Sequence, residues 1–150
     1  MLLGALLFLG TLLQAQSIWT NSITGTNPNT SNPYILGQTV ASGLTVSGIG
    51  RGSGITGTNA NNRYNANGWD SGSLNLNDYF YFTLTPANGR TLDLVSFVYS
   101  GQASTTGATQ VAFRSSVDNY ATNIGGPTIS GTTIALNNAA YQNIPGPITF

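Results

Sequence analysis

Five side chains between positions 51 and 70 have the chemistry to bind a carbohydrate: Arg51, Arg63, Tyr64, Trp69 and Asp70. An aromatic ring can stack on the apolar face of a pyranose, while guanidinium and carboxylate groups hydrogen-bond its hydroxyls in fixed directions. No other stretch of the sequence groups such side chains as densely, so we predict a ligand site here. The alternative is structural: Trp69 caps the core, and Arg51 or Arg63 forms an ion pair with an Asp.

Few side chains are available for catalysis. The sequence holds four acidic residues, all Asp, and four basic residues, all Arg, and it contains no His, Cys, Glu or Lys. It therefore lacks the residues of a Ser-His-Asp triad, a thiol nucleophile, a usual zinc site or a disulfide framework. A glycosidase needs two carboxylates about 5 to 10 Å apart, and none of Asp70, Asp78, Asp93 and Asp118 lies in a recognisable motif. We predict that the protein is not an enzyme and uses no cofactor.

The charge balance also limits the partners. The net charge is zero, so the chain lacks the basic footprint of a nucleic-acid-binding protein. Calcium binds Asp, Asn and backbone oxygens, but the Asn-rich residues 59–67 contain no carboxylate. We predict no nucleic-acid partner and no metal site, and a structural calcium ion is left open.

Residues 116–122, Ser-Val-Asp-Asn-Tyr-Ala-Thr, resemble the Asp-box hairpin of sialidase-like repeats, although Asn119 and Tyr120 replace part of that pattern. In such a turn the Asp side chain accepts backbone N–H bonds. We therefore expect Asp118 to be structural and to bind no ligand. A pairing of Arg114 with Asp118 would be structural as well.

The first residues have the pattern of an export signal. Residues 2–13, LLGALLFLGTLL, are uncharged and mostly apolar, and they precede the polar residues 14–17. A membrane span needs about 20 such residues, so this run is too short to cross a bilayer but fits the apolar region of a signal peptide. We predict a signal peptide over residues 1–15 and a secreted module over residues 16–150 that is not membrane-bound. The alternative is a buried N-terminal helix.

The mature chain is predicted to be all-β. Its clearest strand, residues 79–85, alternates so that one face should be core, while Tyr81 and Thr83 should be more exposed. Further strands are expected over residues 92–99, with a bulge or bend at residues 95–96 where the alternation changes parity. The expected core residues are Phe80, Phe82, Leu84, Leu92, Leu94, Phe97 and Phe113.

Other short strands are predicted over residues 111–114, 133–136 and 147–150, and residues 86–89 predict a turn of the hairpin kind. The abundance of Thr, Asn, Ser and Gly disfavours helix, so we expect none longer than two turns. This spacing of strands predicts an antiparallel β-sandwich, jelly-roll-like in type. Because the sequence stops at Phe150 inside an apparent strand, we expect the module to be C-terminally incomplete, lacking its last strand or strands and exposing a sheet edge.

Several runs of residues, in this order, resemble an N-terminal β-sandwich module of secreted bacterial proteins that carry PEP-CTERM or type IX secretion C-terminal sorting signals. The runs are Trp19-Thr20-Asn21, residues 23–28, residues 48–52, Asn62-Arg63-Tyr64, Gly68-Trp69, residues 77–83 and residues 113–118. The resemblance covers about residues 17–150 and implies a β-sandwich fold and export. It brings no established activity with it.

These observations lead to two hypotheses about function. The first is a non-catalytic secreted module for binding or display at the bacterial cell surface or in the extracellular matrix. The second is a carbohydrate-binding module that accompanies an enzyme domain outside this sequence. Either reading gives a polysaccharide or other cell-surface material as the expected partner.

Overall fold

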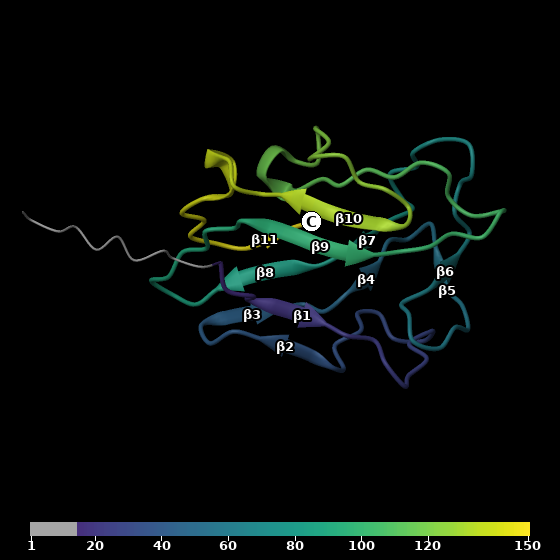
Figure 1. Cartoon of the computed structure of the whole chain (residues 1–150), viewed down its shortest axis with the longest axis horizontal. Coiled ribbons are helices and arrows are strands. Elements are labelled where there is room, and N and C mark those ends of the chain that lie inside the picture. Colours follow the sequence, from purple (N-terminus) through teal and green to yellow (C-terminus); the bar gives the residue numbers. More distant parts are fainter. Residues whose placement is uncertain (1–14) are drawn as a thin grey trace, which may run out of the picture.

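The structure is a computed structural model that describes residues 15–150, and Figure 1 shows it as a set of short strands joined by long loops. The predicted signal peptide, apart from Ala15, lies outside the described residues. The all-β prediction is confirmed: over residues 15–150 the only helical segments are the short 3₁₀ turns η1 (Ser116–Asp118) and η2 (Ala139–Tyr141). This part of the chain contains no helix that could cross a membrane.

The strands pair antiparallel throughout. A three-stranded sheet has the order β11-β8-β3, and four further pairs are β1-β2, β9-β10, β4-β7 and β5-β6. These pairings alone do not define a jelly-roll order. The strands are β1 (Trp19–Asn21), β2 (Gln38–Val40), β3 (Leu44–Val46), β4 (Gly50–Arg51), β5 (Thr56–Gly57), β6 (Ala66–Asn67), β7 (Phe80–Tyr81), β8 (Thr83–Pro86), β9 (Ser96–Ser100), β10 (Gly131–Ala135) and β11 (Ile148–Thr149).

The β3-β8 and β4-β7 pairs form one ladder with an interruption. Val46 pairs with Leu84 and Gly50 pairs with Tyr81, so the first strand contains one residue more than the second between these pairs. The extra residue is accommodated near Gly48, whose φ of 81° is a conformation that glycine adopts without strain. The ladder thus runs from the core into the loops that carry the predicted ligand site.

The core lies around Phe82, the residue that joins β7 to β8, where side chains of β1 and β9 meet Phe150, the residue after β11. The Phe82 ring has its centroid 4.7 Å from that of Trp19, 4.8 Å from that of Phe97 and 5.4 Å from that of Phe150. Phe113 closes this group, because its ring stacks on both Phe97 and Phe150. The buried apolar residues of the cluster are Val46, Phe82, Leu84, Leu92, Leu94, Ile124, Ile134, Leu136, Tyr141, Ile148 and Phe150.

Most of the predicted core is confirmed. Phe82, Leu84, Leu92 and Leu94 are buried, and the half-buried Phe97 and Phe113 pack against them. Tyr81 and Thr83 are more exposed than Phe82, as expected. The predicted break in the alternation at residues 95–96 is also present, since the neighbours Val95 and Ser96 are both exposed.

Three predictions about the fold are wrong. Phe80 is 39% exposed, because its strand has left the core by that point and enters the loops. Residues 111–114 form no strand, although the carbonyl of Phe113 accepts a hydrogen bond from Ile124 N. Residues 86–89 do form a turn, but it connects β8 and β9, which lie in different sheets, and so it closes no hairpin.

The strand β11 lies at the edge of its sheet. Phe150 and Phe82 exchange two backbone hydrogen bonds of 2.9 and 3.1 Å, which extend the β11-β8 ladder by one residue. On the other side, Thr149 N donates to Ser116 Oγ at 3.0 Å. The η1 turn thereby covers part of an edge that would otherwise expose its N–H groups.

Candidate functional site

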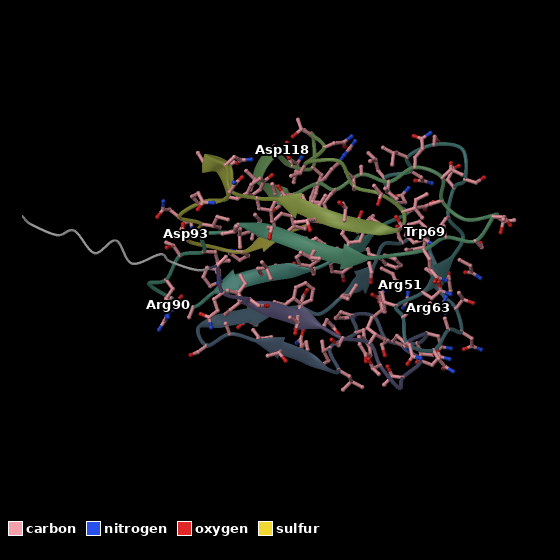
Figure 2. The ribbon with its side chains drawn as sticks, in the orientation of Figure 1. Arg51, Arg63, Trp69, Arg90, Asp93 and Asp118 are labelled. Atoms are coloured by element: carbon pink, nitrogen blue, oxygen red, sulfur yellow. The ribbon has the colours of Figure 1, made fainter. Side chains whose placement is uncertain are left out.

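The predicted site residues lie together at one end of the molecule. Figure 2 shows Arg51, Arg63 and Trp69 near one another, while Arg90 and Asp93 lie at the opposite end. We call the first region the loop end and define it as residues 26–32 and 50–81. Its only regular elements are the two-residue ladders β4-β7 and β5-β6.

Arg51 is the centre of the loop end, and its side chain is buried, with 6% of the residue exposed. Its Nε and one Nη donate to the Asn65 carbonyl at 3.0 and 2.7 Å. The guanidinium also donates to the carbonyls of Ser31 at 2.8 Å, Pro28 at 3.2 Å and Asn29 at 3.4 Å. A guanidinium has five N–H donors in a fixed fork, and here all five have a carbonyl partner.

These bonds give Arg51 a structural role that differs from the expected ion pair, because the acceptors are backbone carbonyls of the loops. Burial lowers the pKa of the Arg51 guanidinium below its usual value, and the nearby Tyr64 partly offsets this effect. A buried cation is tolerated only when its donors are all satisfied. Arg51 therefore ties residues 28–31 to Asn65 and has no N–H group left for a ligand.

Three aromatic rings continue from Arg51 toward the surface. The Arg51 Cζ lies 3.7 Å from the centroid of the Tyr64 ring, which is cation–π geometry. The centroids of Tyr64 and Phe80 are 5.4 Å apart, and Trp69 meets Phe80 edge-on at 5.0 Å. Burial raises the pKa of the Tyr64 hydroxyl, against the opposing effect of the Arg51 charge. Trp69 donates from Nε1 to the Ala66 carbonyl at 3.0 Å and remains half-buried.

Arg63 and Asp70 are exposed at the rim of the loop end. Arg63 Nε makes one long bond of 3.4 Å to the carbonyl of Asn61. The Asp70 carboxylate accepts the Gly72 N–H at 2.9 Å, while its own N–H donates to Asp78 Oδ2 at 2.8 Å. The structure thus brings Arg51, Tyr64 and Trp69 together through Phe80, and it leaves Arg63 and Asp70 outside that group.

The opposite face of the β4-β7 ladder carries a second aromatic pair, Tyr79 and Tyr81, whose ring centroids are 6.1 Å apart. A Cβ placed on Gly50 would lie 2.3 Å from the Tyr81 ring, and one on Gly52 would lie 2.6 Å from the Tyr79 ring. The two rings therefore lie across the backbone of the neighbouring strand in the space that these glycines leave. We call Tyr79 and Tyr81 the tyrosine pair; Tyr79 is 46% exposed.

Our reading of the sequence missed the tyrosine pair, although the sequence carries a signal for it. The glycines at positions 50, 52 and 54 alternate in the run Gly-Arg-Gly-Ser-Gly. In a strand, alternate residues share one face, so this strand presents a bare backbone on one side. Such a bare strip can be covered by aromatic side chains of the paired strand, here by those of Tyr79 and Tyr81.

The turn at Asp118 has the structure predicted from its sequence. The Asp118 carboxylate accepts the N–H groups of Ala121 at 3.2 Å and Thr122 at 3.0 Å, and also the Thr122 hydroxyl. These bonds, led by that of the hydroxyl, hold the pKa of the carboxyl below its usual 3.8. Arg114 donates to Asn123 Oδ1 at 2.8 Å and to the Tyr120 carbonyl at 3.2 Å. These partners replace the pairing with Asp118 that the sequence suggested.

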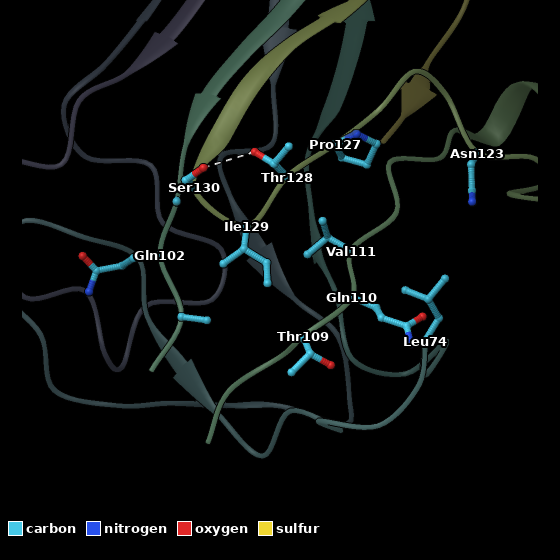
Figure 3. A pocket seen from close by; sticks show the side chains of 12 residues that line it. Leu74, Gln102, Thr109, Gln110, Val111, Asn123, Pro127, Thr128, Ile129 and Ser130 are labelled. Carbon is cyan, nitrogen blue, oxygen red and sulfur yellow. Dashed lines mark hydrogen bonds between the residues drawn. The ribbon is translucent and has the colours of Figure 1, made fainter. Parts of the chain in front are cut away.

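A shallow hollow of about 780 Å³ lies at the edge of the loop end, between Leu74 and the long connection from β9 to β10 (Figure 3). Amides, hydroxyls and aliphatic side chains line it, and its lining includes no charged or aromatic residue. The Thr128 and Ser130 hydroxyls are hydrogen-bonded to each other at 3.3 Å on its wall. The lining residues are Leu74, Gly101, Gln102, Ala103, Thr109, Gln110, Val111, Asn123, Pro127, Thr128, Ile129 and Ser130.

Within residues 15–150 no three His, Cys, Asp or Glu side chains gather closely enough to hold a metal ion. Comparison of the chain with protein-family models, with curated proteins and with solved structures found no match.

Proposed function

We propose that the chain is a non-catalytic, exported β-sandwich module that serves in binding or display at the bacterial cell surface or in the extracellular matrix. The observation that carries this proposal is the division of the molecule into a packed core and a loop end with exposed aromatic side chains. Tyr79 and Phe80 are 46% and 39% exposed at that end. Exposed aromatic side chains grouped on a rigid ladder are typical of binding surfaces.

The arrangement of the carboxylates supports a role without catalysis. Asp70 and Asp78 are the two acidic residues of the loop end, and each is used in its own loop. Asp78 Oδ2 accepts the Asp70 N–H, and Asp70 accepts from Gly72 N and, at 3.5 Å, from Ser73 Oγ. A general acid and base would instead have to face a common substrate.

A second candidate, a carbohydrate-binding module accompanying an enzyme domain, is favoured by the tyrosine pair. The rings of Tyr79 and Tyr81 lie over Gly50 and Gly52, so the backbone fixes their position before any ligand arrives. Preorganised aromatic surfaces bind without first losing side-chain entropy. A neutral sugar would also suit a surface with few charges.

Export is tested by fusing residues 1–15 to a reporter enzyme that needs disulfides and is active only in an oxidising compartment. We expect activity from this fusion in a bacterial host. The matched control is a reporter that carries only an initiator Met in place of residues 1–15, which should be inactive. An inactive fusion made in equal amounts would contradict export through this segment.

Binding is tested on a glycan array with residues 16–150. If the tyrosine pair is the site, replacing Tyr79 and Tyr81 together by Ala should weaken binding about tenfold or more, equivalent to at least ~1.4 kcal/mol. Tyr120→Ala is the matched control, because Tyr120 is 41% exposed but follows the η1 turn and lies outside the loop end. Loss with Trp69→Ala and not with the tyrosine variant would place the ligand on the originally predicted face. No binding to any glycan would reject the carbohydrate candidate and leave protein partners to be tested.

A further inference from the structure

The strands β1 and β9 lie on either side of a groove whose lining includes Phe82, the residue that joins β7 to β8, and Phe150. Figure 1 shows β1 and β9 pointing in the same direction, with β8 between them in the view and running the opposite way. The Phe82 ring contacts Trp19 from β1 and Phe97 from β9, at centroid distances of 4.7 and 4.8 Å. An open groove of about 2800 Å³ has residues 15–24 along one wall and residues 93–104 along the other, with Phe82 and Phe150 also in its lining, and it continues to the loop end.

Several backbone groups of β9 that face this groove have no hydrogen-bond partner within residues 15–150. The bonds Leu136 N to Val95 O and Gly101 N to Ser130 O show that the odd-numbered residues of β9 make the ladder bonds to β10. In an antiparallel ladder, the residues between them point their N–H and C=O groups to the other edge. These are Ser96, Val98 and Ser100.

The backbone of β1 presents such groups from the other wall. The bond from Ala41 N to Ile18 O, with the register of the pair, shows that Ile18 and Thr20 make the ladder bonds to β2. Trp19 and Asn21 therefore direct their N–H and C=O groups away from β2. The Asn21 Oδ1 atom is buried and has no hydrogen-bond partner within the described residues.

The chemistry of the walls specifies what would fit. Two strand edges that run in the same direction can both pair with one strand antiparallel to each of them. Neither Trp19–Asn21 nor Ser96–Ser100 contains a charged residue, so a matching strand would be uncharged. The half-buried rings of Trp19 and Phe97 face inward and would be covered by apolar side chains at alternate positions.

We propose that this groove receives an extended, uncharged peptide strand of a different protein, antiparallel to β1 and β9, with apolar residues at every second position. The strand joins the two walls into one continuous sheet over Phe82, in the recognition mode known as β-strand addition. Main-chain hydrogen bonds supply affinity, and Trp19 and Phe97 select the inward side chains. This interaction is independent of the tyrosine pair, which lies on the loop end.

The test uses residues 16–150 and the acetylated and amidated peptide Thr-Val-Thr-Phe-Thr-Val-Thr. We expect the peptide to slow amide hydrogen exchange at Trp19, Asn21, Ser96, Val98 and Ser100 at least tenfold. The same peptide with N-methyl groups at its second, fourth and sixth residues, or at its first, third, fifth and seventh, loses the donors toward one wall. Each methylated peptide should bind at least tenfold more weakly.

Val98→Pro and Thr133→Pro form a matched pair on the protein. The two residues are opposite each other in the β9-β10 ladder at a position without mutual hydrogen bonds. Val98→Pro removes an N–H that points into the groove and should weaken binding at least tenfold, whereas Thr133→Pro removes one from the far edge of β10 and should not. Binding that leaves the five amides unprotected, or no binding by the unmethylated peptide, overturns the proposal. Protection that rises with protein concentration without peptide also overturns it, in favour of a second copy of this chain.

Discussion

The core and the loop end stabilise the same chain by different means. In the core, Phe82, Leu84 and Ile134 are held by removal of apolar surface from water, a force without direction. In the loop end, Arg51 binds carbonyls that come from positions 14 to 23 residues distant in sequence. Strands of two residues cannot satisfy the backbone of long loops, and one buried guanidinium supplies the missing donors.

The two regions should therefore respond differently to substitution. Apolar packing tolerates changes that keep volume and hydrophobicity. A buried polar network has no comparable tolerance, because a carbonyl that loses its donor in a dry site keeps the full cost of its desolvation. Arg51 should thus be the less replaceable residue even where a substitution keeps its charge.

The largest effect is expected in the core. Phe82→Ala removes the ring that contacts Trp19, Phe97 and Phe150, and it should lower the free energy of unfolding by about 3 to 5 kcal/mol. Urea unfolding measures the change. Phe82→Leu keeps most of the volume and should cost clearly less; equal losses in both variants would show that the ring stacking, and not the filled volume, holds the core.

Arg51→Lys tests the loop end and should lower the free energy of unfolding by about 2 to 4 kcal/mol, because a Lys ammonium has three donors and no planar fork for the five bonds to four carbonyls. We expect the amide hydrogen exchange rates of Ala66 and Ser31 to increase more than those of Phe82 and Phe150, because the loops lose their bonds first. Arg63→Lys is the matched control, since Arg63 is exposed and makes a single long bond. If Arg51→Lys is as mild as Arg63→Lys, the guanidinium network does not stabilise the loops.

The same difference explains what could be predicted from the sequence. The core residues Phe82 and Leu84 could be predicted from the alternation of apolar side chains, because the period of a strand is local information. The role of Arg51 did not, since its acceptors are carbonyls whose positions depend on the folded loops. Phe80 was misplaced for a related reason: alternation gives the face of a strand but not the point at which the core beneath it ends.

Gly52→Ala tests whether the glycine strip holds the tyrosine pair. A Cβ on Gly52 would lie 2.5 Å from the Asn77 carbonyl oxygen and 2.6 Å from the Tyr79 ring. We expect the free energy of unfolding to fall by about 1 to 3 kcal/mol, as for other overpacked sites. The chemical shifts of the Tyr79 ring should change because the ring is displaced. Gly126→Ala is the control, because a Cβ there meets no atom within 4 Å. An unchanged Tyr79 spectrum in Gly52→Ala would show that the strip leaves the ring free.

The smallest effect concerns the Asp118 turn, which joins the core at the β11 edge through Ser116. The Thr122 hydroxyl and the N–H groups of Thr122 and Ala121 lower the pKa of the Asp118 carboxyl. A carboxyl whose pKa is lower in the folded than in the unfolded chain stabilises the fold above the unfolded value, near 3.8. That contribution is lost as the pH falls through the folded value.

Thr122→Val removes the hydroxyl donor at nearly constant volume and keeps both N–H bonds. We expect the pKa of Asp118, followed by NMR of its carboxyl carbon, to rise toward its usual value. The variant should be slightly less stable than the parent at pH 6, and this difference should disappear below the folded pKa of the parent, where Asp118 is protonated in both chains. A stability difference that is the same at pH 6 and at pH 2 would assign the effect of Thr122 to packing and leave the charge of Asp118 without a role in the turn.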